Sequence, residues 1–245
     1  MKSQPTNHQD GLYPIKIASE HFFAISAGIF WIMFLVPMSL GQCSSDLLIN
    51  ICILGGIQCA LVVLLLLYFY RSERWPFINP IKPRFINSIV QAIIGEIQLL
   101  PFLYIFDILW YKVLTLLQRS LHFDLKEQAL VGLLRSELSN GTQLCTVIIF
   151  TVIIVPIEEE IVFRYFLYRF GKSHMSPFKA MLCTSAAFAL LHFNLSASMP
   201  LFFMGMFLVW LYERCGHLTP CIIVHGMYNY IAVLSTLLLP KEISL

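Results

Sequence analysis

Long apolar segments alternate with short polar ones along most of this chain of 245 residues. A helix needs about 20 apolar residues to cross the hydrocarbon core of a bilayer. The pattern predicts about seven transmembrane helices, at approximately residues 21–41, 47–70, 86–117, 142–170, 178–196, 199–214 and 219–239. We therefore expect an all-α fold, a polytopic helical bundle in a membrane.

Two polar stretches divide this pattern into parts. Residues 71–84 contain Pro76, Pro80 and Pro83, which prevent a continuous helix and indicate a linker. Residues 122–137 alternate charged and leucine-rich positions at helical spacing, which predicts an amphipathic helix lying at the interface. The expected organisation is a polar N-terminal segment (1–20), N-terminal transmembrane helices (21–120) and a core (121–245) of the interfacial helix plus four transmembrane helices.

Composition supports lipid as the main solvent. Hydrophobic residues make up 58% of the chain and charged residues only 12%, whereas soluble domains carry about 25% charged residues. The net charge is only +2 and basic residues form no long runs, so nucleic acid is not an expected partner. The seven cysteines are scattered singly in apolar sequence, which is typical of small buried side chains.

The distribution of Lys and Arg predicts the orientation. With the seven predicted helices and a cytoplasmic N-terminus, one side receives Lys2, Lys16, Arg71, Arg74, Lys82, Arg84, Arg169, Lys172, Lys179 and Arg214. The other side receives Arg119, Lys126, Arg135 and Lys241. This asymmetry agrees with the positive-inside rule.

The predicted helix at 142–170 contains ionisable residues where apolar ones are expected. Glu158, Glu159, Glu160 and Arg164 lie inside apolar sequence. Inserting four such residues near the centre of a helix costs about 10–14 kcal/mol, and the apolar neighbours return about 4–7 kcal/mol. Other helices or a wet cavity must shelter these groups, and ionisable residues in such places are candidates for function.

Helical spacing separates the three glutamates. Glu160 and Arg164 are four residues apart and share one face, which favours an ion pair. Glu159 projects about 100° away from Glu160 and is free to hold a water molecule. Pro156 removes a backbone donor and is expected to leave a carbonyl group without its helical partner beside the glutamates.

Two later predicted helices carry matching polar groups. His192 lies in the fifth helix, and the seventh places His225 and Asn229 on one face, with Gly226 allowing close approach of a backbone or ligand. Together with Glu159 they could form one cavity suited to hydrolysis. A carboxylate can act as a general base toward water, a histidine can orient that water and later protonate the leaving amine, and an amide and a second imidazole can stabilise an oxyanion.

Three motifs resemble those of the CAAX-protease and bacteriocin-processing (CPBP, or Abi) family. Glu159 to Arg164 read EEIVFR, Phe188 to His192 read FALLH, and His225 to Asn229 read HGMYN; they are similar to EExxxR, FxxxH and HxxxN/D. The similarity covers about residues 140–240. It implies an intramembrane endopeptidase in which Glu159 and His192 activate water, His225 and Asn229 hold the oxyanion, and Glu160 and Arg164 support the site. The additional Glu158 departs from the pattern, and the spacing to Arg164 selects Glu159.

Several alternatives remain open from sequence. Glu159, His192 and His225 suit zinc, although the favoured reading needs no cofactor. Instead of a protease, the chain could be a non-catalytic membrane scaffold or bacteriocin-immunity-type protein of the same family. A proton-coupled transporter is disfavoured, because no internal repeat is present. The polar residues of the third predicted helix, Gln91, Glu96, Gln98 and Asp107, either line the cavity or pair between helices.

The resemblance also implies partners and a location. The expected partners are the lipid bilayer and a peptide or protein substrate, with prenylated CaaX proteins as one class. The chain is expected to be a multi-pass protein of a bacterial inner membrane, or of the endoplasmic reticulum if it is eukaryotic. Signatures of other intramembrane proteases (HExxH, GxSG and GxGD) are missing from the sequence.

Overall fold

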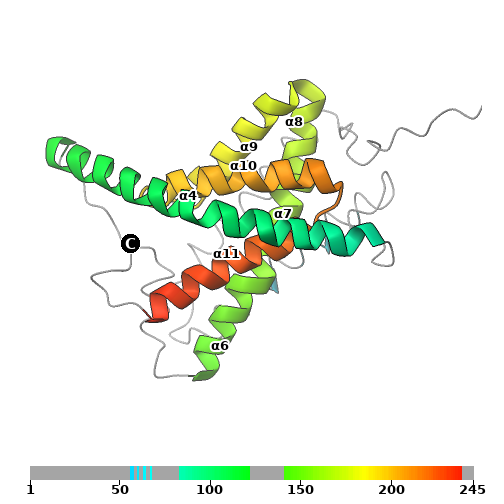
Figure 1. The fold of residues 1–245 in the computed structure, drawn as a ribbon, viewed down its shortest axis with the longest axis horizontal. Helices are drawn as coiled ribbons and strands as arrows, with labels where there is room; N and C mark the ends of the chain where they lie inside the picture. Colours follow the sequence, from blue (N-terminus) through cyan, green and yellow to red (C-terminus); the bar gives the residue numbers. More distant parts are fainter. Residues whose placement is uncertain are drawn as a thin grey trace, which may run out of the picture.

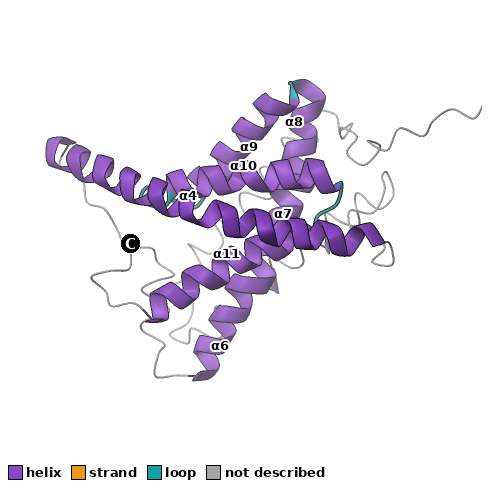
Figure 2. Ribbon diagram, in the orientation of Figure 1, coloured by secondary structure: helices purple, strands orange, loops and turns teal. Residues whose placement is uncertain are grey.

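The computed structural model describes residues 83–121 and 141–238, together with isolated helical positions between residues 56 and 67. These described parts consist of helices and short loops, without a strand (Figure 2). The helices are α4 (Pro83–Leu121), α6 (Gly141–Ile149), η2 (Phe150–Ile154), α7 (Val155–Glu160), η3 (Ile161–Tyr168), α8 (Arg169–His174), α9 (Pro177–Leu191), α10 (Ser198–Cys215) and α11 (Thr219–Leu238). The predicted all-α class is confirmed for this part of the chain.

The predicted helices can be compared with the observed ones from residue 83 onwards. The segments predicted at 86–117, 199–214 and 219–239 correspond to α4, α10 and α11 with small shifts at their ends. The segment predicted at 142–170 is a continuous run of helical backbone from Gly141 to His174. The predicted helix at 21–41, most of that at 47–70, the linker up to residue 82 and the interfacial helix at 122–137 lie outside the described residues. The total of seven therefore stays a prediction.

Two of the described helices are long and apolar enough to cross a membrane. They are α4, over Ile86–Arg119, and α11, over Thr219–Leu238. Helix α9 is apolar but shorter, with 15 residues. Many large apolar side chains of α4 are exposed, among them Ile94, Ile97 and Leu109. Such a surface suits a lipid environment.

The helical run from Gly141 to His174 lies at the centre of the arrangement, and other helices pack on its sides (Figure 1). Helix α9 turns back beside this run and packs closely on α10. Helix α11 packs on η2, α7 and α10, while α4 crosses both α10 and α11. The segment that carries the three glutamates is thereby enclosed by helices from the rest of the described chain.

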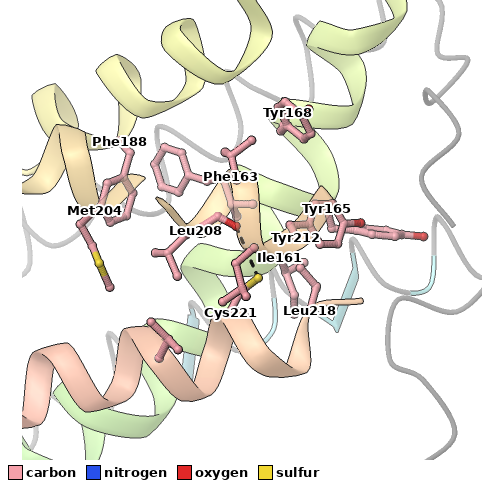
Figure 3. Packing of buried hydrophobic residues seen from close by; sticks show 14 of the residues in the cluster. Ile161, Phe163, Tyr165, Tyr168, Phe188, Met204, Leu208, Tyr212, Leu218 and Cys221 are labelled. Carbon is pink, nitrogen blue, oxygen red and sulfur yellow. Dashed lines mark hydrogen bonds between the residues drawn. The ribbon is translucent and has the colours of Figure 1, made fainter. Parts of the chain in front are cut away.

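One hydrophobic core joins η3, α9, α10 and α11 (Figure 3). Phe163, Phe188, Met204 and Leu208 are among its buried members. Helices α9 and α10 approach so closely that a Cβ atom at Gly205 would lie 3.1 Å from the Cα atom of Ser185. Small residues at such crossings let membrane helices pack tightly.

The prediction of a helix over residues 178–196 is wrong at its C-terminal end, because α9 ends at Leu191. Phe193 has a φ angle of 50°, which leaves the right-handed helical region. The side-chain oxygen of Asn194 then accepts hydrogen bonds from the backbone N–H groups of Ser196 and Ala197. This Asx turn starts a new helix at Ser198, so His192 caps α9 and does not lie inside a transmembrane helix.

Helix α4 fastens the loop that follows His192. The indole Nε1 of Trp110 donates a 2.8 Å hydrogen bond to the carbonyl oxygen of Leu195. This bond joins the N-terminal half of the chain to the loop between α9 and α10.

Replacing Trp110 by Phe removes this donor while keeping an aromatic ring. We expect Trp110→Phe to lower the free energy of unfolding by about 1 kcal/mol and the melting temperature by about 2–4 °C. The measurement is thermal unfolding of the purified protein in detergent. Trp210→Phe, at a half-exposed position of α10, is the matched control; an equal shift in both variants would show that the Trp110 hydrogen bond is not responsible.

Candidate active site

The backbone before the glutamates is π-helical. In η2 the N–H of Val155 bonds to the carbonyl of Phe150, five residues earlier. The next donor in this register would come from Pro156, which has no N–H, so the Thr151 carbonyl lacks a partner within its own helix. The side-chain Nδ2 of Asn229 donates a 2.9 Å hydrogen bond to that Thr151 oxygen. The free carbonyl expected beside Pro156 is therefore present, and it fixes α11 against η2.

Close contact between these two helices requires glycine at position 226. A Cβ atom there would lie 2.6 Å from the carbonyl oxygen of Val152. The approach to a backbone expected at Gly226 is thus an approach to the π-helical segment η2. It brings His225, on the same stretch of α11, next to the glutamates of α7.

Glu160 is shared between a buried arginine and a buried histidine. Its Oε1 atom lies 2.8 Å from Nη1 of Arg164 and 2.8 Å from Nδ1 of His225. The side chains of Glu160, Arg164 and His225 are 0%, 1% and 3% exposed. The ion pair expected from the spacing of Glu160 and Arg164 is formed, and the same carboxylate also orients the imidazole of His225.

Glu159 lies between two imidazole rings. Its Oε1 is 3.8 Å from Nε2 of His192, and its Oε2 is 3.5 Å from Nε2 of His225. The Glu159 side chain is 14% exposed, more open than Glu160. Both separations are longer than a direct hydrogen bond and short enough for one bridging water.

The remaining ring nitrogens define the tautomers. Nδ1 of His192 lies 2.7 Å from the backbone carbonyl of Phe188, which can only accept, so Nδ1 carries the hydrogen. Nδ1 of His225 faces the Glu160 carboxylate and is likewise the donor. Both rings are thereby held with Nε2 directed toward Glu159. The hydrogen bond made by Nδ1 decides the tautomer and so determines what Nε2 can do.

The extra glutamate, Glu158, is buried and lies beside Glu159 in the sequence. Glu158 is 2% exposed, but the carboxylate that approaches both imidazoles is that of Glu159. The choice between Glu158 and Glu159 made from the spacing to Arg164 agrees with this geometry.

The polar residues of α4 divide into two groups. Gln91 and Gln98 are exposed, whereas Glu96 is fully buried and Asp107 is partly buried. Glu96 lies on the inner side of α4 with Ala92 and Leu103, which are also buried. Both alternatives for this group, lining the cavity or pairing between helices, stay predictions.

The structure brings Glu159, Glu160, Arg164, His192 and His225 into one cluster and ties Asn229 to the adjacent backbone. Sequence reasoning missed two parts of this cluster. One is the Thr151 carbonyl as the acceptor for Asn229; its signal was the five-residue spacing to Pro156. The other is the ring of Phe188, which lies 4.7 Å from the His192 ring and 4.5 Å from the Arg164 guanidinium.

Carboxylate and imidazole groups are ligands that suit zinc. Among the described residues, no three His, Cys, Asp or Glu side chains are grouped as a metal ion would require. The zinc alternative at Glu159, His192 and His225 stays a prediction from the sequence.

Comparison with known proteins identifies the domain. Residues 141–231 match the family described as Rce1-like, the type II CAAX prenyl endopeptidases. This segment holds all the site residues named above and the three motifs, and over it the chain is similar to the CAAX-protease family. The family is integral to membranes, which fits the two long apolar helices. Comparisons with curated proteins and with solved structures give no significant match.

Replacing Gly226 by Ala tests the helix contact that holds the site. The added methyl group would meet a backbone oxygen that cannot rotate away, so α11 must shift from η2. We expect Gly226→Ala to lower the free energy of unfolding by about 1–3 kcal/mol, measured by thermal unfolding in detergent. Gly141→Ala, where a Cβ atom meets nothing within 4 Å, should leave stability nearly unchanged; equal stability of both variants would contradict the close contact.

Proposed function

We propose that the chain is a multi-pass intramembrane endopeptidase that resembles the CAAX prenyl proteases and cleaves a peptide bond of a lipidated or membrane-inserted substrate. The observation that carries this proposal is the position of Glu159, 3.8 Å from Nε2 of His192 and 3.5 Å from Nε2 of His225. A carboxylate between two oriented imidazoles can hold one water molecule and remove its proton.

The first step is attack of water on the substrate carbonyl carbon. One hydrogen of the water points to the Glu159 carboxylate, and the lone pair on Nε2 of His192 accepts the other. As the new C–O bond forms, Glu159 takes the proton. His192 keeps the water in line because its own Nδ1–H is fixed on the Phe188 carbonyl.

The second requirement is stabilisation of the oxyanion. His225 carries out this role through Nε2–H when its ring is protonated. Asn229 uses one amide hydrogen on Thr151 and has a second for the oxyanion. Preorganised donors of this kind are worth about 10²–10³ in rate each. The C–N bond then breaks, and the proton taken from water passes to the leaving amine.

The mechanism uses no metal or other cofactor. The family relationship implies a peptide substrate embedded in the membrane. We propose a cytoplasmic N-terminus, because the distribution of Lys and Arg described above agrees with the positive-inside rule. We propose a bacterial inner membrane as the location. In a eukaryote, the membrane would be that of the endoplasmic reticulum and the substrates would be prenylated CaaX proteins.

The second candidate is a non-catalytic scaffold or immunity-type protein that binds a partner in the same cavity. The partial exposure of Glu159 is compatible with either function, but a purely structural carboxylate would not need two imidazoles turned toward it. The two candidates differ in their response to loss of the Glu159 charge.

Glu159→Gln keeps the shape of the side chain and removes its ability to take a proton. We expect this variant to lose about 10²–10⁴-fold in kcat with unchanged protein levels and folding. The assay uses the purified protein in liposomes with farnesylated CaaX peptides, and with unmodified transmembrane peptides as a second substrate class.

Glu213→Gln is the matched control. Glu213 pairs with Lys172 at a partly exposed position on α10, and the variant should retain full activity. Cleavage by Glu159→Gln at the rate of the control would refute the proposed role of Glu159. If no peptide is cleaved, and partner binding is unchanged in Glu159→Gln, the scaffold reading is correct.

A further inference from the structure

The ring of Phe188 occupies the centre of the candidate site without a role in the reaction above. Phe188 is a residue of α9, four positions before His192, and its side chain is fully buried. Its ring contacts groups from three elements: Arg164 of η3, His192 at the end of α9 and His225 of α11. Figure 3 shows Phe188 beside Phe163 in the hydrophobic core.

The guanidinium of Arg164 depends on more than its ion pair. Its side chain is 1% exposed, and Nη1 bonds to Glu160. Nε and Nη2 have no hydrogen-bond partner among the described residues. The guanidinium carbon instead lies 4.5 Å from the centroid of the Phe188 ring, within the range of a cation–π contact. The negative face of this ring therefore stabilises the guanidinium charge in part, where a second hydrogen-bond acceptor would otherwise be needed.

The same ring limits the motion of both imidazoles. The ring centroid lies 4.7 Å from that of His192 and 5.7 Å from that of His225. The interplanar angles are 63° and 77°, which are edge-to-face arrangements. Phe163 packs on Phe188 at 5.1 Å and 89°, so the ring itself cannot move freely.

We propose that Phe188 is a positioning residue of the active site, whose π face holds Arg164 and whose ring packs against His192 and His225 and keeps them in register with Glu159. The chain of contacts runs from Phe188 to Arg164, from Arg164 to Glu160, and from Glu160 to Nδ1 of His225. Weakening the first contact allows Arg164 to shift, and the shared carboxylate then no longer fixes His225. The inference rests on the proposed peptidase function for its kinetic consequence but not for the contact itself.

Simple packing is the competing explanation for a buried phenylalanine. Truncation to Leu or Ala would lower activity under both explanations, because it also leaves a cavity. Stepwise fluorination separates them, since each ring fluorine withdraws electron density from the π face while the ring keeps nearly the same size. The proposal therefore predicts that kcat and the melting temperature fall with each added fluorine. Packing alone predicts that neither changes along the series.

The experiment places 4-fluoro-, 3,5-difluoro- and 3,4,5-trifluorophenylalanine at position 188 of the full chain in liposomes. We expect kcat to fall in steps, by about tenfold in total, with KM nearly unchanged because the substrate does not touch this ring. The melting temperature in detergent should fall in the same order. The same series at Phe106, which packs on Phe102 and Phe203 away from the site, should leave kcat unchanged.

The outcomes distinguish the two levels of the argument. A flat series of melting temperatures at position 188 overturns the cation–π contact, whatever the activity. A graded melting temperature with constant kcat shows that Phe188 only stabilises the fold and overturns its positioning role. Lack of cleavage by the unmodified chain overturns the proposed peptidase function, and the positioning role with it, while the melting series still decides the contact.

Discussion

The candidate site depends on one buried charge, the guanidinium of Arg164. Arginine cannot lose its proton inside a protein, so its burial at 1% exposure demands a carboxylate in hydrogen-bond contact. Glu160 provides it, and the second function of the same oxygen is to accept from Nδ1 of His225. The carboxylate that neutralises buried Arg164 therefore also orients His225, because it fixes which nitrogen of His225 faces Glu159.

A second constraint comes from Pro156, which breaks the backbone hydrogen bonding one turn before the glutamates. The carbonyl that it leaves at Thr151 is satisfied by Asn229, and the adjacent Val152 oxygen lies where only Gly226 permits approach. In lipid an unsatisfied carbonyl is expensive, so this bond stabilises the π-helical segment and fixes α11 against η2. The irregular backbone and the position of α11 beside the candidate site thus have the same origin.

Much of this site could be predicted from the sequence because its residues recur at spacings that place them on one face of a helix. The i, i+4 spacing gives the Glu160–Arg164 pair, and the order of the three motifs gives the neighbours of Glu159. The end of α9 was missed because Phe193, Leu195 and Ala197 continue the apolar pattern, whereas the turn depends on a single side chain, Asn194. The FxxxH-like motif singles out Phe188, but its contact with Arg164 could not be predicted, because an apolar side chain does not reveal a charged neighbour from another helix.

The central claim is that Glu159 acts on water and does not itself attack the substrate. A single turnover in H₂¹⁸O with a peptide that the protein cleaves tests this directly, because the attacking oxygen ends in a stable product. The account predicts one ¹⁸O atom in the new carboxyl terminus of the peptide and none in the side chain of Glu159, read by mass spectrometry of both. Label in the Glu159 carboxylate after that turnover would show a covalent acyl intermediate and would contradict the account.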